Sequence, residues 1–349
     1  MNSYERVIDT LSHQEPDRTP IFEYVLKSPV ADEILDRPYA VDEKWVNKMI
    51  AEKGWEKTIH QQAIDYLEIA DILKHDLFYI PRNPLPPKKS SQNPPPLIFD
   101  DPVKEVAQRI KERENNLSPP EEQFLIYRLI HQEMRKREMN LPIFAPAYTH
   151  GVWADVALMQ TMILEPELAH RHFKLATEYA LKVINKYLDL GIEMIGIGGD
   201  FAGNRGPLIS PKLYHKFIVP EVRRLSQYIH QAGKKAINGS DGNLWPVIDD
   251  FLIGCEVDGY IEIEFRAGMN LAKLKKLFGD RITFFGNLDC ANILSFGTPE
   301  EVKKHTKECL KRGKGNGGHI LCSNNAITES IPLKNFLAIY EAYQEFFQL

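Results

Sequence analysis

Four short apolar runs in the last third of the chain share one pattern, because each ends in small polar residues and is followed by an amphipathic helix. The runs begin at Lys235, Asp258, Arg281 and His319. Buried parallel strands read as nearly continuous hydrophobic runs, and strands that alternate with helices form β/α units. The pattern therefore predicts four consecutive β/α units of a parallel sheet.

Four earlier segments fit the same description and raise the number of expected strands to eight. They lie at 21–26, 71–80, 140–151 and 192–200. Eight β/α units make a TIM (β/α)8 barrel. A chain of 349 residues is within the range that such a barrel reaches as one domain. We therefore expect residues 1–349 to form a single barrel domain of the α/β class.

The region between the second and third expected strands has a different composition. Residues 81–96 are rich in proline, which can continue neither a helix nor a strand ladder. Two charged helices are expected to follow, near 103–115 and 119–139. We interpret 81–139 as a helical and proline-rich insertion that covers one side of the barrel.

Composition excludes several classes of protein. Hydrophobic residues make up 43% and charged residues 26% of the chain, and the formal net charge is −5. These values are typical of a globular protein, and they do not favour nucleic acid as a partner.

The four cysteines form no CxxC pair, and no apolar stretch approaches the ~20 residues that span a bilayer. We expect a cytoplasmic protein.

Three carboxylates at strand ends are the expected catalytic residues, because ligand chemistry in a TIM barrel gathers at the carboxyl ends of the strands. Asp200 follows a Gly-Gly pair, and Asp241 lies in a Ser-Asp-Gly-Asn segment. The third is Glu264, which alternates with Glu262 and isoleucines, so both carboxylates face one side of their strand, with Glu262 the deeper of the two. Burial there would raise a pKa into the range of a general acid. Turn or capping roles remain open for Asp200 and Asp241, since Asp favours both.

Further side chains at strand ends are expected to bind the substrate, and Tyr24 and Tyr148 among them can stack on an aromatic group. The full set is Glu23, Tyr24, Tyr148, His150, Asn238, Ser240, Asn287, Asn324 and Asn325. The histidines lack the spacing that places two metal ligands on one helical face, so no metal ligand is predicted from spacing.

Several motifs resemble those of the uroporphyrinogen decarboxylase superfamily, and within it the branch of cobalamin-dependent methyltransferases. They are Glu15-Pro-Asp-Arg-Thr-Pro20, Gly206-Pro-Leu-Ile-Ser-Pro211, Ser240-Asp-Gly-Asn243, Gly286-Asn-Leu-Asp289 and Gly297-Thr-Pro-Glu-Glu301. The resemblance implies a TIM-type barrel with a deep pocket at its carboxyl face.

The chain departs from two activities of that superfamily. The decarboxylase carries an arginine-rich segment in its first strand, whereas residues 22–27 contain Glu23 and no arginine, although a porphyrinogen's carboxylates need cationic partners. The thiol methyltransferases hold zinc with a His-x-Cys pair and a later cysteine. Those positions fall on Gly239, Asp241 and Asn325 here. Harder oxygen ligands could also bind zinc, although their spacing does not support it.

The resemblance then favours the third group, in which O-demethylation of methoxylated aromatic or related compounds passes a methyl group to a corrinoid protein. We expect a methyltransferase component of such a system, with a small-molecule methyl donor and a corrinoid (cobalamin) carried by a partner protein. Two alternatives stay open: a decarboxylase of the uroporphyrinogen type, and a non-catalytic subunit of a corrinoid system.

Overall fold

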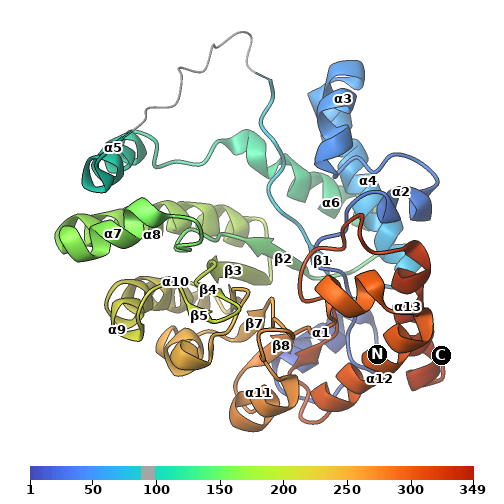
Figure 1. Cartoon of the computed structure of the whole chain (residues 1–349). Coiled ribbons are helices and arrows are strands. Elements are labelled where there is room, and N and C mark those ends of the chain that lie inside the picture. Colours follow the sequence, from blue (N-terminus) through green and yellow to red (C-terminus); the bar gives the residue numbers. More distant parts are fainter. Residues whose placement is uncertain (88–98) are drawn as a thin grey trace.

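A curved parallel sheet lies at the centre of the protein and helices surround it (Figure 1). The computed structural model describes residues 1–87 and 99–349. The main sheet has the order β1, β2, β3, β6, β7, β8, β9, and all neighbouring strands are parallel. Its strands are β1 (Phe78–Tyr79), β2 (Ile143–Pro146), β3 (Met194–Gly198), β6 (Lys235–Gly239), β7 (Gly259–Ile261), β8 (Thr283–Phe285) and β9 (His319–Ile320).

An eighth strand position, at residues 21–26, closes this sheet into a barrel. It precedes β1 in the chain, and we call it the first strand. Ile21 forms a parallel bridge with Leu321, and the backbone N–H of Phe22 donates to the Leu321 carbonyl at 3.2 Å. On its other side, the Ile21 carbonyl accepts from the N–H of Asp76 at 2.8 Å, just before β1. The residues around Ile21 therefore stand between β9 and β1, and the predicted (β/α)8 barrel is confirmed.

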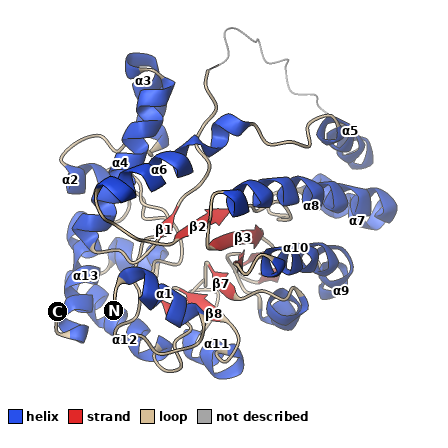
Figure 2. Cartoon of the chain, turned by 180° about the vertical axis from the view of Figure 1, so that it is seen from behind, coloured by secondary structure: helices blue, strands red, loops and turns tan. Residues whose placement is uncertain are grey.

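Helices form the outer layer, and Figure 2 shows them around the strands from behind. They are α1 (Ser3–Leu11), α2 (Val30–Leu35), α3 (Glu43–Lys53), α4 (Trp55–Leu73), α5 (Pro102–Glu114), α6 (Leu125–Lys136), α7 (Val156–Leu164), α8 (Pro166–Asp189), α9 (Pro211–Leu213), α10 (Val219–Gln231), α11 (Leu271–Phe278), α12 (Pro299–Gly313) and α13 (Leu333–Phe347). Among residues 1–87 and 99–349, no helix is both long and apolar enough to cross a membrane.

The segment 201–211 contains a small hairpin. Its strands are β4 (Ala202–Gly203) and β5 (Gly206–Pro207), which pair antiparallel. Ser210 then caps the helix that follows, because its hydroxyl accepts from the Leu213 N–H at 3.3 Å. This cap agrees with the start signal in the sequence, where Ser-Pro opens a helix.

The region 81–139 is divided between two parts of the outer layer. Helix α5 packs against α7 and α8, whereas α6 packs against α4. Because β1 and β2 are parallel neighbours, the chain between them must cross over, and α6 takes the place of the crossover helix. The helical part of 81–139 thus contains the crossover helix α6 as well as α5, which packs elsewhere. Residues 88–98 of the proline-rich stretch lie outside the described residues.

The amino-terminal half of the barrel interior is filled with apolar side chains. They form a separate cluster made of Val7, Leu11, Phe22, Tyr24, Leu77, Tyr79, Phe144, Met194, Ile237, Ile261, Phe285, Ile320 and Cys322. Val7 and Leu11 come from α1, which lies across the amino end of the barrel, and the Thr10 carbonyl there accepts from the Gly318 N–H at 2.9 Å. Ligand access is therefore left to the carboxyl end.

A buried carboxylate ties the closing strand to its neighbours. Asp76 is fully buried, and its side chain accepts from Arg6 at 2.7 Å, from Arg18 at 2.8 Å and from the hydroxyl of Ser3 at 2.8 Å. It also accepts from the backbone N–H of Ile21 at 3.0 Å. One side chain thus connects α1, the turn at residues 15–20, the first strand and β1.

Replacement of Asp76 by alanine is expected to destabilise the protein by about 3–5 kcal/mol, because it removes a fully buried carboxylate that pairs with the buried Arg6 and the partly buried Arg18. Urea unfolding measures this change. The control is Asp71→Ala, whose exposed pair with Lys74 should contribute less than about 1 kcal/mol. Equal small effects from both variants would contradict the role of Asp76 in closing the barrel.

Candidate active site

A pocket opens at the carboxyl end of the barrel, and we call it the barrel-mouth pocket. It has a volume of about 480 Å³. Its walls come from the ends of the first strand, β2, β3, β6 and β7. The residues that line it are Tyr24, Tyr148, Thr149, Gly151, Trp153, Gly199, Asp200, Gly239 and Glu262.

Close backbone contact between two loops fixes the position of Asp200. Gly199 has a φ of +148°, and a Cβ atom there would lie 2.6 Å from the backbone nitrogen of Gly151. A Cβ on Gly151 would in turn lie 2.8 Å from the backbone nitrogen of Asp200. Only glycine allows this approach, which explains the Gly-Gly pair before Asp200.

Asp241 has the most perturbed environment of the three predicted catalytic residues. Its Oδ2 accepts from Asn325 at 2.7 Å, while its Oδ1 is buried without a hydrogen-bond partner among the described residues. Burial raises the pKa of Asp241 to about 7, with further contributions from the charges of Asp200 and Glu264, and the Asn325 hydrogen bond opposes the shift. Asp241 can therefore give up or take a proton near neutral pH.

Glu264 is held at the rim by two donors. Its Oε1 accepts from the side chain of Asn324 at 3.1 Å and from the backbone N–H of Arg266 at 3.1 Å. Burial raises the pKa of Glu264, while the hydrogen bond from Arg266 lowers it. Asn324 thus orients a carboxylate, and its contact with substrate stays a prediction.

Glu262 also lines the pocket, although it was not among the predicted site residues. It has a φ of 69°, which is rare for a residue with a side chain and is a form of strain found at functional sites. Burial raises its pKa well above the usual range, Asp241 and Asp200 add to this, and the hydrogen bond with Tyr24 opposes it. The alternation of residues 261–264 was the signal that could have found it.

Two aromatic residues complete the pocket. The Tyr148 hydroxyl is buried and has no hydrogen-bond partner within the described ranges, so it is free to bond to a ligand. Trp153 lines the pocket with 60% of its surface exposed. It was not among the predicted site residues either, and its place just after a strand end was the only signal available.

Four predicted substrate-binding residues do not line the barrel-mouth pocket: His150, Asn238, Ser240 and Asn287. The His150 ring lies between the hydroxyls of Thr149 (3.0 Å) and Thr177 (2.9 Å), and burial lowers its pKa to about 3. The side-chain amides of Asn238 and Asn287 donate to the carbonyls of Phe251 and Met269, each at 3.2 Å. The Ser240 hydroxyl accepts from the Phe201 N–H at 2.9 Å. These polar side chains are thus hydrogen-bonded to other groups of the protein.

Glu23 belongs to a second cavity and does not line the barrel-mouth pocket. Its Oε2 accepts from the hydroxyl of Ser323 at 2.6 Å. Tyr24 lines both cavities. The strand pleat accounts for this difference, since consecutive side chains point to opposite faces.

The electrostatic character of the barrel-mouth pocket is acidic. Asp200 and Glu262 line it. Asp241 and Glu264 lie close enough for their charges to raise the pKa values of neighbouring carboxylates. Its described lining contains no lysine or arginine. Since no cation balances these carboxylates there, protonation is the way in which they reduce their repulsion.

The donor set does not fit a zinc ion held by soft ligands. Of the positions that correspond to the zinc ligands of the thiol methyltransferases, Asp241 and Asn325 bond to each other, and a Cβ on Gly239 would lie 2.9 Å from the Tyr148 hydroxyl. In the part of the chain that the structure describes, no group of three or more His, Cys, Asp or Glu side chains is arranged to hold a metal. We assign no step to zinc.

Comparison with known proteins identifies the family. The model of the family described as uroporphyrinogen decarboxylase (URO-D) matches residues 155–346. The chain belongs to this family. The match confirms the superfamily that the sequence motifs indicated.

Named relatives within the family include two kinds of enzyme. The chain is 26% identical to a methylated-thiol–coenzyme M methyltransferase of Methanosarcina mazei (61% of this chain, 56% of the relative). It is 24% identical to a methylcobamide:CoM methyltransferase of Methanosarcina barkeri (55% and 53%) and 23% identical to a uroporphyrinogen decarboxylase of Coxiella burnetii (52% and 48%). The chain spans about half the length of these relatives. Their being enzymes agrees with the class that the resemblance implied.

A solved structure supports the fold over nearly the whole chain. A methyltransferase from Methanosarcina mazei superposes with a TM-score of 0.69 over 99% of both chains, at 17% sequence identity. At this identity the likeness extends to the barrel architecture alone.

The Asp241→Asn variant is expected to be more stable than the wild type at pH 8. Asp241 has a pKa of about 7 in the folded protein against an ordinary 3.8, so the folded state holds its proton more tightly. The wild type therefore loses stability as the pH rises from about 4 to about 7, by up to about 4 kcal/mol at 1.36 kcal/mol per pKa unit. The amide of the variant cannot ionise, so the variant should lose none of this. Thermal unfolding of both proteins at pH 5 and pH 8 measures the difference, and parallel pH dependences would refute it.

Proposed function

We propose that this protein is the methyltransferase component of a corrinoid-dependent system. It moves a methyl group from a methylated small molecule, with methoxylated aromatic compounds as the favoured class, to a corrinoid carried by a partner protein. The observation that carries the proposal is the Asp241 carboxyl group, whose pKa is raised to about 7 beside an acidic pocket. The names of the two methyltransferase relatives support the same reaction class.

Cleavage of a methyl ether needs a proton for the oxygen that leaves. When the methyl carbon is transferred, the C–O bond breaks and both of its electrons stay with oxygen. The corrinoid supplies the nucleophile that takes the methyl carbon. Asp241, protonated below its pKa of about 7, donates the proton, so that the product leaves as a neutral phenol or alcohol.

The other residues of the site hold the substrate and the acid in place. Asn325 orients Asp241 through its 2.7 Å hydrogen bond. Tyr24 and Tyr148 offer aromatic surface to a methoxyarene, and the free Tyr148 hydroxyl can donate to its oxygen. The charges of Asp200 and Glu264 add to the effect of burial and favour the protonated form of Asp241.

Uroporphyrinogen decarboxylation is a weaker candidate for this pocket. Its substrate carries many carboxylates, which would face Asp200 and Glu262 with no lysine or arginine in the described lining. Repulsion between like charges disfavours such a complex. Release of carbon dioxide from uroporphyrinogen would reverse this preference.

A non-catalytic subunit would bind a corrinoid protein without turnover.

Methyl transfer from a panel of methoxyarenes to free cob(I)alamin tests the proposal, followed by the absorbance change of the corrinoid. Asp241→Asn should lower kcat by about 10²–10⁴-fold, the usual contribution of a general acid. The wild-type rate should fall above about pH 7, as Asp241 loses its proton. The control is Asp280→Asn, an exposed carboxylate, which should leave the rate unchanged. No transfer by folded wild-type protein would overturn the proposal.

Exposed apolar side chains near the pocket suit the approach of a partner protein. Trp153 is 60% exposed and lines the barrel-mouth pocket, and Val156 at the start of α7 is 58% exposed. Such residues mark interaction sites when they gather at a functional opening.

Trp153→Ala is therefore expected to reduce the rate with protein-bound corrinoid at least tenfold, as loss of an aromatic interface residue does, while the rate with free cob(I)alamin changes less. Parallel rate measurements with both acceptors check this. Phe296→Ala, at 78% exposure and outside the residues that line the barrel-mouth pocket, is the matched control. An equal loss with both acceptors would show that Trp153 acts on the donor and does not dock a partner.

A further inference from the structure

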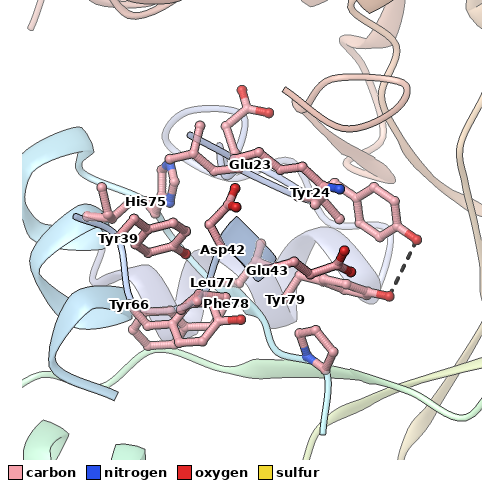
Figure 3. Close-up of a pocket in the computed structure, with 16 residues that line it drawn as sticks. Glu23, Tyr24, Tyr39, Asp42, Glu43, Tyr66, His75, Leu77, Phe78 and Tyr79 are labelled. Carbon is pink, nitrogen blue, oxygen red and sulfur yellow. Dashed lines mark hydrogen bonds between the residues drawn. The ribbon is translucent and has the colours of Figure 1, made fainter. Parts of the chain in front are cut away.

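A second cavity lies beside the barrel mouth, and we call it the tyrosine cavity. It has a volume of about 180 Å³ and is enclosed by the first strand, the segment 39–43, α4 and β1. Figure 3 shows the labelled side chains of its lining, with a dashed line between Tyr24 and Tyr79 and the Glu23 carboxylate at the edge of the group. Four tyrosines contribute to its walls: Tyr24, Tyr39, Tyr66 and Tyr79.

The aromatic rings of this cavity form two pairs. Tyr24 and Tyr79 have ring centroids 4.4 Å apart, and their hydroxyls lie 3.4 Å apart, as the dashed line in Figure 3 marks. Tyr39 and Tyr66 have centroids 6.4 Å apart in an edge-to-face arrangement. Aromatic faces attract cations through their quadrupole, and cages of several rings recognise methylated ammonium groups.

The charged side chains of the cavity are mainly acidic. Glu23, Asp42 and Glu43 line it, and Lys27 at its exposed rim is the one lysine or arginine of its described lining. His75 adds no positive charge, because burial lowers its pKa to about 3 and its Nε2 bonds to the Tyr340 hydroxyl at 2.8 Å. The cavity therefore disfavours anions.

Glu23 supplies an independent sign of a missing ligand. Its side chain is buried, and Oε1 has no hydrogen-bond partner within residues 1–87 and 99–349, whereas Oε2 accepts from Ser323. A buried carboxylate without compensation is costly, so it needs either a proton or a cation nearby.

We propose that the tyrosine cavity binds a small organic cation of the methylated ammonium class, with the rings around the methyl groups and Glu23 as the counter-charge. The size is suitable, because a cavity of roughly 150 Å³ admits benzene and this one is slightly larger. Glu43, Lys27 and Pro81 are the exposed members of its lining and mark its opening. The site is separate from the barrel-mouth pocket, with Tyr24 as the shared wall.

Calorimetric titration of the whole protein with choline tests this proposal, and 3,3-dimethyl-1-butanol serves as the neutral molecule of the same shape. Choline should bind at least tenfold more tightly than the alcohol. Equal affinities would overturn the proposal, because shape without charge would then explain the binding. Absence of choline binding would overturn it as well.

Two pairs of variants locate the cation. Glu23→Gln should weaken choline binding at least tenfold, while Asp200→Asn in the barrel-mouth pocket should leave it unchanged. Tyr39→Leu should weaken binding and Tyr39→Phe should retain it, because the ring and not the hydroxyl makes the contact. Loss of binding in Asp200→Asn but not in Glu23→Gln would place the cation in the other pocket and refute the assignment. Thermal unfolding checks that each variant is folded. If Glu23→Gln does not fold, the Tyr39 pair decides whether choline binds in the tyrosine cavity.

The pH dependence of binding gives a further check that does not depend on catalysis. Burial raises the pKa of Glu23 to about 7, against the hydrogen bonds from Ser323. Choline affinity should therefore fall about tenfold per pH unit below pH 7, as Glu23 takes up a proton, and should stay flat in Glu23→Gln. The other ionisable groups around Glu23 and the cavity are Tyr24, Lys27, Asp42, Glu43, Tyr66, His75, Tyr79, Cys290, Cys322 and Tyr340. A wild-type affinity that does not change with pH would contradict the role of Glu23.

Discussion

The hydrogen bonds and ion pairs around Asp76 are the interaction on which the rest of the structure depends. The first strand joins the barrel through a few backbone hydrogen bonds at Ile21 and Phe22, so it has little ladder of its own. Asp76 adds a bond to the Ile21 N–H and anchors it through two arginines. Because Glu23 and Tyr24 follow within three residues, the position of this strand also sets the walls of both cavities.

Burial has different consequences at the two ends of the barrel. At the amino end the interior is filled by apolar side chains and covered by α1, and the buried Asp76 carboxylate there is neutralised by Arg6 and Arg18. At the carboxyl end several carboxylates share a space whose described lining contains no lysine or arginine. Desolvation and mutual repulsion then act in the same direction and favour their protonated forms. The acidity near pH 7 is therefore a product of position, since an exposed aspartate would ionise far lower.

Side-chain direction separates the site residues that the sequence could predict from those that it could not. Hydrophobic runs and their polar ends predicted the strands, and Asp200, Asp241 and Glu264 do gather at one end of the barrel. The same reasoning selected Asn238 and His150, whose polar atoms lie behind the strands. A residue at the end of a strand points inward or outward according to the local pleat and the loop that follows, and residue type carries no information on this.

The sequence by itself determined the class of fold, the family and the end of the barrel where chemistry is expected, because these depend on local patterns of burial, turn residues and motifs. Only the tertiary structure decided which groups meet. Asp241 and Asn325 are far apart in the sequence, and closure of the barrel brings them within 2.7 Å. The tyrosine cavity is likewise assembled from strands, a loop and a helix. Long-range contacts of this kind arise from packing and register, and no single segment encodes them.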